Sequence, residues 1–158
     1  MHTLSNPWSI WVHYMNDTDW SKTSYVTIHT CETAEEIITT HETMIQSEPV
    51  FKKHMIFFMK YNIYPMWEDE SNKDGGCFVF YLANATMYEK WKTVLYSVIG
   101  NTISTSNEFM DDITGVVISP RRHYYVVQLW MKTKTHSSTC ISKSILDPAY
   151  PEITFKLF

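Results

Sequence analysis

The alternation of apolar and polar residues predicts strands along most of this chain. Segments rich in β-branched and aromatic residues are separated by short polar turns, which is typical of half-buried strands. The expected strands cover residues 8–14, 24–30, 55–60, 77–82, 111–122, 123–132 and 152–158. Successive side chains of a strand point to opposite faces. In 123–132 one face should carry Val126, Gln128, Trp130 and Lys132, and the other face, packed on helices, Val127, Leu129 and Met131.

Two capping boxes mark the starts of helices. Thr33 with Glu36, and Thr86 with Glu89, have the spacing of a capping box. In such a box the side chain of each residue accepts a hydrogen bond from the backbone N–H of the other. Residues at helical spacing follow each box: Ile37, Ile38, His41, Met44 and Ile45 after the first, and Tyr88, Trp91, Leu95, Val98 and Ile99 after the second. Gly100 is the expected end of the second helix, and residues 137–147 are expected to form a short third one. Strands and three helices in this order predict an α+β fold, in one domain over residues 1–158.

Composition and charge narrow the classes of function. A net charge of −4 argues against a long basic track for RNA phosphates, so an RNA ligand should be short and chemically distinct. Three widely spaced cysteines favour reduced thiols over a disulfide framework or a zinc site. Apolar runs are too short for a membrane span and the first residues lack a signal-peptide pattern, so we expect a cytoplasmic protein. The sequence has no nucleophile–base pair, metal cluster or glycine-rich phosphate loop. We therefore expect a monomeric binding protein without catalytic residues, cofactor or metal.

Residues 64–76 contain a tryptophan followed by a carboxylate, Trp67 and Glu68, shortly before a Gly-Gly turn. This pair suits a flat ligand with hydrogen-bond donors along one edge. The N1–H and 2-amino groups of guanine form such an edge, which one ionised glutamate accepts. Methylation at N7 gives the base a positive charge, so an indole attracts it by cation–π interaction as well as stacking. The alternative is that Trp67 closes a core and residues 68–70 form a solvated acidic turn.

The same segment resembles a known signature. Residues 65–76 read Pro-Met-Trp-Glu-Asp-Glu-x-Asn-Lys-x-Gly-Gly, which is similar to the signature of the eukaryotic translation initiation factor 4E family, whose members hold the 7-methylguanosine cap of messenger RNA. The residues His2, Leu4, Asn6, Trp8, Trp11, Trp91 and Ile99-Gly100 also fit the family pattern. The resemblance implies a curved antiparallel sheet with helices on its convex face and a cap slot on the concave side. In this fold we interpret Trp8 as a core residue. We expect Trp11 to pack on the side of the sheet that binds the family's scaffold partner.

The resemblance also implies roles for individual residues. Trp20 and Trp67 would clamp the methylated base, and the carboxylate of Glu68 would read its edge. Trp130 would touch the N7 methyl group, and Arg121 would hold the first phosphates. The family's second phosphate-contacting base falls on Val126, so Arg122 and Lys132 are the nearest candidates for further phosphate contacts; the alternative for each is an ordinary solvated cation.

The partner surface departs from the family pattern. Family members bind a Tyr-x-x-x-x-Leu-Φ helix of a scaffold subunit or repressor on the convex face, where this chain has His2, Leu4, Ile38 and Tyr96. Ile38 stands where the family has a tryptophan, and Thr93 where it has an acidic residue. Two functions fit this pattern: cap recognition that recruits messenger RNA for translation, with a divergent scaffold-type partner, or a cap-binding repressor or storage factor that does not engage the usual scaffold. An apolar-ligand carrier or small-molecule enzyme is a third alternative, supported only by the tryptophan-rich composition.

Overall fold

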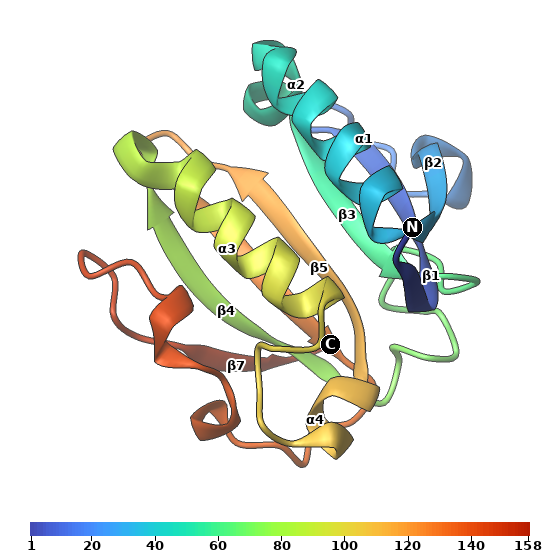
Figure 1. Ribbon diagram of the computed structural model, residues 1–158. Helices are drawn as coiled ribbons and strands as arrows, with labels where there is room; N and C mark the ends of the chain where they lie inside the picture. Colours follow the sequence, from blue (N-terminus) through green and yellow to red (C-terminus); the bar gives the residue numbers. More distant parts are fainter.

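A curved, open antiparallel sheet of seven strands forms the frame of the protein (Figure 1). The computed structural model describes residues 1–158 except the side chain of Glu48. The strand order is β2-β1-β3-β5-β6-β4-β7. The strands are β1 (Thr3–Tyr14), β2 (Val26–Thr33), β3 (His54–Lys60), β4 (Gly76–Ala83), β5 (Ile113–Pro120), β6 (Tyr124–Met131) and β7 (Thr154–Leu157). All the expected strands form, and the first begins five residues earlier than the sequence suggests.

The two faces of the sheet carry two separate apolar clusters. Val127, Leu129 and Met131 of β6 belong to the larger cluster, which the helices cover. Val126 and Trp130 belong to the smaller cluster on the other face, which we call the open face. The alternation predicted for this strand is therefore confirmed. Trp8 lies in the larger cluster as expected, but Trp11 packs on the open face, so its assignment to the partner side is wrong.

The helices lie over one side of the sheet. They are α1 (Ala34–Gln46), α2 (Glu48–Lys53), α3 (Met87–Ile99) and α4 (Asn107–Asp111). In Figure 1, α1 and α3 run over this side next to one another. The first capping box forms as predicted, because Thr33 and Glu36 each bond the other's backbone. The helix buries Ile37, His41 and Met44 but leaves Ile38 45% exposed, so the expected apolar stripe is narrower than predicted.

The second capping box is not present. The Thr86 hydroxyl instead donates a hydrogen bond to Asp147, at 3.2 Å, and makes no cap bond with its own helix. Asp147 also accepts the backbone N–H groups of Ala83 and Ala149, both at 2.9 Å, and these bonds lower the pKa of its carboxyl group. Thr86 ends a 3₁₀ turn, Asn84–Thr86, with a ψ of 9° and not in the extended conformation of an N-cap, so its hydroxyl group is not placed to accept the N–H of Glu89.

The third predicted helix is also wrong. Residues 137–147 form two single 3₁₀ turns, Ser138–Cys140 and Lys143–Ile145. Hydroxyl side chains in this segment bond nearby backbone groups; Ser137 Oγ, for example, accepts the N–H of Thr139 at 3.2 Å. Such bonds compete with helix formation. The short helices α2 and α4, in contrast, fall in stretches for which the sequence analysis predicted no helix.

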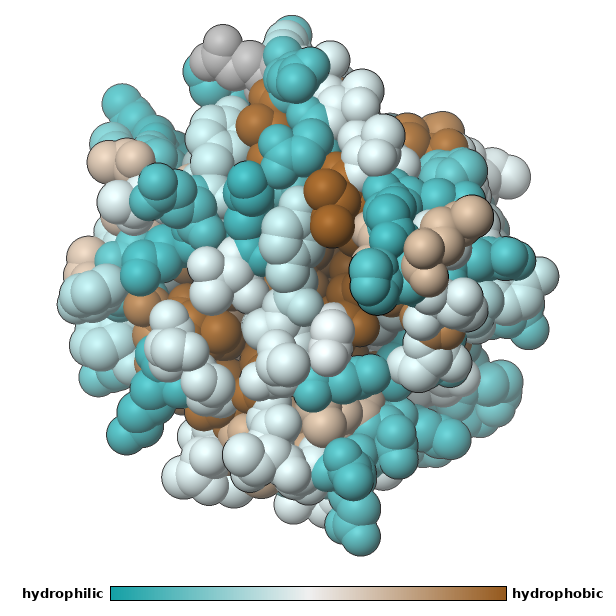
Figure 2. Space-filling view, viewed as in Figure 1, coloured by the Kyte–Doolittle hydropathy of each residue, from teal (hydrophilic) through white to brown (hydrophobic). Residues whose placement is uncertain are grey.

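The surface over the helices is mainly polar. Figure 2 shows this side as mostly hydrophilic or intermediate, with hydrophobic residues in a strip near the centre and in a patch at the lower left. Among the described residues, no helix combines the length and the apolar character needed to cross a membrane.

Candidate functional site

Hydrogen bonds made by a buried asparagine and a nearby aspartate fix the loop that carries Trp67. The side-chain amide of Asn72 is completely buried and donates to the carbonyl oxygens of Tyr64, at 3.2 Å, and Met66, at 2.8 Å. The carboxylate of Asp69 accepts the backbone N–H groups of Tyr64 and Ser71, both at 2.9 Å. Asn72 and Asp69, the polar residues that form these bonds, therefore stabilise one conformation of the loop between β3 and β4.

This loop presents its indole and the carboxylate next to it to solvent. Trp67 is 56% exposed and Glu68 is exposed as well. The interpretation of Trp67 as a residue that closes a core is therefore wrong. Glu70 differs from Glu68 because it forms an ion pair with Lys73 at 2.8 Å. Glu68 is the carboxylate adjacent to the exposed indole.

The second indole lies in the loop between β1 and β2. Trp20 is 48% exposed, and its ring stacks on that of His13 with 3.9 Å between centroids. The other exposed indole, Trp67, stacks on the ring of Phe158. Each of the two exposed indoles therefore has a different stacking partner. Neither His13 nor Phe158 was identified from the sequence, where both read as ordinary strand residues.

Tyr25 connects the two loops on the open face of the sheet. Its ring lies 6.3 Å from the ring of Trp20, 6.3 Å from that of Tyr64 and 5.6 Å from that of Phe57. Burial, followed by the negative charge of Glu68, raises the pKa of Tyr25 to about 12. The hydroxyl group of Tyr64, in the Trp67 loop, donates to the carbonyl oxygen of Lys22, in the Trp20 loop, at 3.0 Å. The Trp20 loop and the Trp67 loop therefore approach each other on the face that the helices do not cover.

Trp130 lies on the same face but is closed to solvent. Only 2% of its surface is exposed, and its Nε1–H donates to Gln128 Oε1 at 2.9 Å. Its ring meets those of Phe57, at 6.0 Å, and Phe158, at 4.8 Å. Phe158 thus contacts both Trp67 and Trp130.

The candidate phosphate-binding cations lie at the two ends of β6. Arg121, in the turn before this strand, donates from Nη1 to Ser119 Oγ at 3.2 Å and to the carbonyl oxygen of Pro120 at 2.9 Å. Arg122 beside it and Lys132 beyond the far end of the strand are exposed. The strand between them is about 25 Å long at the usual rise per residue. Arg121 and Lys132 therefore do not reach the same phosphate group. Val126 is buried in the apolar cluster of the open face.

One group of side chains has the composition of a metal site. Donor atoms of His29, Cys31 and Glu36 all lie within 4.8 Å of one another. Glu36 already accepts the backbone N–H groups of Glu32, at 2.6 Å, and Thr33, at 3.2 Å, through one oxygen. Cys31 is completely buried, and burial raises the pKa of its thiol group. The capping of α1 accounts for the position of this carboxylate without a metal ion.

The residues expected on the partner surface lie around α1 and α3. His2 is exposed and its Nδ1 lies 2.7 Å from Glu35, whereas Leu4 is partly buried against the core. The hydroxyl group of Tyr96 lies 3.3 Å from His41 Nδ1. Ile38 is exposed on α1.

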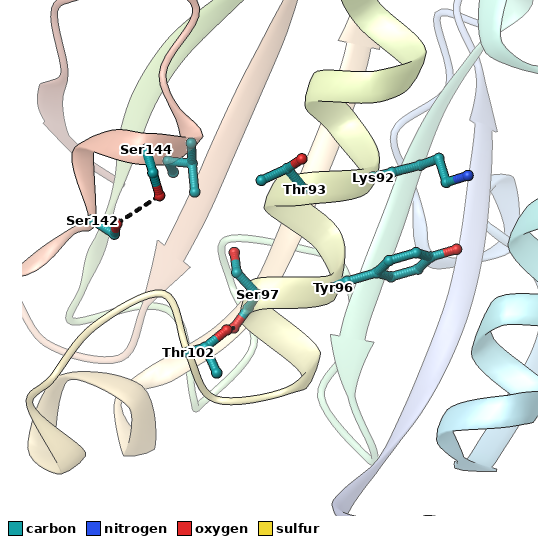
Figure 3. Close-up of a pocket in the computed structure, with 8 residues that line it drawn as sticks. Lys92, Thr93, Tyr96, Ser97, Thr102, Ser142 and Ser144 are labelled. Atoms are coloured by element: carbon teal, nitrogen blue, oxygen red, sulfur yellow. Dashed lines mark hydrogen bonds between the residues drawn. The ribbon is translucent and has the colours of Figure 1, made fainter.

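A hollow of about 450 Å³ opens beside α3 (Figure 3). Figure 3 shows Thr93 and Ser97 pointing toward Ser142 and Ser144, while Lys92 and Tyr96 point away on the other side of the helix. The complete lining is Lys92, Thr93, Tyr96, Ser97, Thr102, Ser142, Ser144 and Ile145. Its walls carry hydroxyl groups and one ammonium group, and Lys92 forms an ion pair with Glu42 at 2.9 Å. The hollow is separate from the two indole loops, which lie on the opposite side of the sheet.

Comparison with known proteins identifies the family. Residues 3–150 match the family model described as Eukaryotic initiation factor 4E. The chain belongs to the eukaryotic initiation factor 4E family. This result confirms the relationship that the sequence motif indicated.

Relatives of the chain come from several groups of organisms. It is 28% identical over 138 residues to eukaryotic translation initiation factor 4E-1 of Schizosaccharomyces pombe, covering 84% of this chain and 61% of the relative. A shorter match, 31% over 61 residues, is to an eukaryotic translation initiation factor 4E homolog of Acanthamoeba polyphaga mimivirus; it covers 39% of this chain and 22% of that protein. The chain spans less than two thirds of the length of these relatives.

Solved structures of the family share the fold. One from Ascaris suum, a complex with the m7G cap, superposes with a TM-score of 0.71 at 21% identity, covering 85% of this chain and 75% of that one. A schistosome structure, complexed with m7GpppG and 4E-BP, superposes with a TM-score of 0.74 at 21% identity, covering 85% of this chain and 74% of that one. The curved α+β architecture is thus that of this family.

Proposed function

We propose that the chain is a single cap-binding domain that holds the 7-methylguanosine cap of messenger RNA and recruits it for translation initiation in the cytoplasm. The observation that carries this proposal is that two half-exposed indoles, Trp20 and Trp67, and the exposed Glu68 lie on two loops that contact each other beside the open face of the sheet. Solved members of the family complexed with the m7G cap support it.

The proposed binding mode follows from the chemistry of the base. Trp20 and Trp67 stack on the two faces of the methylated guanine, each contributing about 1–3 kcal/mol. The positive charge of the ring adds cation–π attraction to both indoles. Glu68 accepts the N1–H and 2-amino protons, and adenine lacks this pair of donors. The wrong base would leave the carboxylate without partners, so selection against it is strong.

The phosphates belong at the Arg121 end of β6. The guanidinium group is held by Ser119 and the Pro120 carbonyl, which leaves further N–H groups for phosphate oxygens. Arg122 is adjacent and serves as a second cation. Binding of this kind makes and breaks no covalent bond, so the proposed protein is a binder and not an enzyme.

Tryptophan fluorescence tests the proposal directly. Titration with 7-methyl-GTP should quench the emission at far lower concentrations than titration with GTP. Glu68→Gln should weaken binding of 7-methyl-GTP tenfold or more, because the amide replaces a charged double acceptor by one acceptor and one donor. Glu70→Gln is the matched control, since Glu70 is paired with Lys73, and it should leave binding unchanged. An equal response of the wild-type protein to both nucleotides would exclude recognition of the charged base.

A cap-binding repressor or storage factor is the second candidate. The α1 position at which the family has a tryptophan is Ile38, and Lys92 on α3 is engaged by Glu42. These residues, with His2, Leu4 and Tyr96, would form the surface for a scaffold-type partner. A solved relative complexed with m7GpppG and 4E-BP supports a partner site in the family. A pull-down with a Tyr-x-x-x-x-Leu-Φ peptide separates the candidates: capture supports an initiation factor, and no capture by a cap-binding chain supports the repressor.

A further inference from the structure

The ring of Phe158 lies between the indoles of Trp67 and Trp130. It is nearly parallel to Trp67, at 16° and 5.9 Å between centroids, and meets Trp130 edge-on at 4.8 Å. A ring that stacks on one indole and touches the other must cover the side of Trp67 that faces Trp130. Trp130 is 2% exposed, so this side of the open face is filled with protein atoms.

A methylated guanine needs the same position. In the proposed binding mode the base stacks on Trp67, and the family resemblance implies that its methyl group touches Trp130. Phe158 makes both of these contacts in this structure. We propose that Phe158 closes the cap slot and that its ring must swing out before a base can stack between the indoles. This inference rests on the proposed function and adds to it that a side chain of the protein itself occupies the cap slot.

The attachment of Phe158 is suited to release. The residue follows β7, a four-residue strand at the edge of the sheet that pairs with β4. Its backbone N–H donates to the carbonyl oxygen of Gly75 at 3.3 Å, which is longer than an ideal bond. Its side chain is only partly buried. Movement of this one residue therefore leaves the pairing of β7 with β4 intact.

If the slot is closed part of the time, the binding of every ligand is weakened by the same factor. The apparent dissociation constant equals the intrinsic one divided by the fraction of open protein. Phe158 therefore lowers affinity for methylated and unmethylated guanine nucleotides alike. The preference between them is set by the indoles and by Glu68 and is unaffected by this equilibrium.

Two substitutions of Phe158 should act in opposite directions. Phe158→Ala should tighten binding of 7-methyl-GTP and of GTP by the same factor, about tenfold or more, since it removes the two aromatic contacts of the closed state, with Trp67 and with Trp130. Phe158→Trp should weaken binding of both, because a larger ring stacks more strongly on Trp67. Leu157→Ala is the matched control: this neighbour is 65% exposed, points to the other face of β7 and should change neither affinity.

A ligand-free measurement provides an independent test. Acrylamide should quench the tryptophan fluorescence of Phe158→Ala more strongly than that of wild type or Leu157→Ala, because Trp67 and Trp130 become accessible. Unchanged quenching, or weaker nucleotide binding by a folded Phe158→Ala protein, would overturn the inference and make Phe158 a support of the slot. If Phe158→Ala does not fold, the Phe158→Trp variant decides: tighter binding of the nucleotides by this variant than by wild type would also overturn the inference. If wild type and all variants bind neither nucleotide, the proposed function fails and the inference with it.

Discussion

The imidazole of His13 lies face to face with the indole of Trp20, with 3.9 Å between ring centroids and 5° between planes. His13 is completely buried, and its Nε2–H donates to the carbonyl oxygen of Asp19 at 2.7 Å. One side chain of β1 thus supports both the backbone beside Trp20 and one face of its ring. The indole is held in place while about half of its surface stays open.

Removal of His13 should loosen the Trp20 loop. His13→Ala eliminates the stacked ring and the bond to Asp19, so we expect affinity for 7-methyl-GTP to fall about tenfold. The free energy of unfolding should drop by about 1–3 kcal/mol, because the variant loses a partly buried hydrogen bond and leaves a cavity where the buried ring packed. Fluorescence titration and urea denaturation measure the two effects.

A second variant separates the ring from the hydrogen bond. His13→Phe keeps a flat ring under Trp20 and loses the bond to Asp19, so it should retain more affinity than the alanine variant. Tyr14→Ala changes the next residue of β1, which is 42% exposed, and serves as the control. Equal affinity of His13→Ala and wild type would show that the loop holds Trp20 without this residue.

Asn72 should be the most sensitive polar residue of the Trp67 loop. Asn72→Ala leaves the carbonyl oxygens of Tyr64 and Met66 without their amide donor, so the free energy of unfolding should fall by about 1–3 kcal/mol. Cap affinity should fall as well, because the backbone beside Trp67 is freed. Lys73→Ala removes only an exposed ion pair and should cost under about 1 kcal/mol. Similar losses in the two variants, measured by urea denaturation, would contradict this account of the loop.

The sequence predicted the strands and the first helix well because their signals are local. Alternation along β6 assigns Val127 and Trp130 to opposite faces, and the box of Thr33 and Glu36 starts α1 without help from the rest of the chain. The box at Thr86 failed because the chain enters α3 through a 3₁₀ turn in which Thr86 lacks the extended N-cap backbone, and its hydroxyl group donates to Asp147, which is remote in sequence. A tertiary contact of this kind leaves no mark in a short stretch of sequence.

The candidate site was predicted only in part for the same reason. The motif identified Trp67 and Glu68, whose exposure fits a ligand-contacting role. Tyr25 and Phe158 read as ordinary strand aromatics, because their positions depend on how β2 and β7 pair with their neighbours. Whether an aromatic residue fills a core or borders a site is decided by packing across strands.

Stability should depend on pH through His41. Burial, opposed by Glu42 and reinforced by the charge of Lys92, lowers the pKa of this histidine to about 4 from an ordinary 6.5. Between these values the unfolded chain binds more protons than the folded one, so the free energy of unfolding falls as the pH drops from about 6.5 to 4. The loss from this group is on the order of 3 kcal/mol, and its full contribution is present above pH 6.5.

Variants of His41 and its neighbour test this assignment. His41→Phe, measured by urea denaturation from pH 7 to pH 4, should lose less stability across the window than wild type. Tyr96→Phe removes the hydroxyl group near His41 Nδ1 but keeps the packing, so it should retain the wild-type pH dependence, since burial is the main cause. Parallel curves for His41→Phe and wild type would assign the acid sensitivity to other groups.

The two ends of β6 should respond differently to the phosphates of the ligand. Arg121→Ala should weaken binding of 7-methyl-GTP about tenfold, the loss of one charge-assisted contact, and leave binding of 7-methylguanosine unchanged. Lys132→Ala lies at the opposite end of the strand, so any effect it has should be the same for nucleotide and nucleoside. Added salt should narrow the difference between wild type and Arg121→Ala, because ions screen the exposed guanidinium group. A selective loss of nucleotide binding in Lys132→Ala would reverse the proposed orientation of the cap along the sheet.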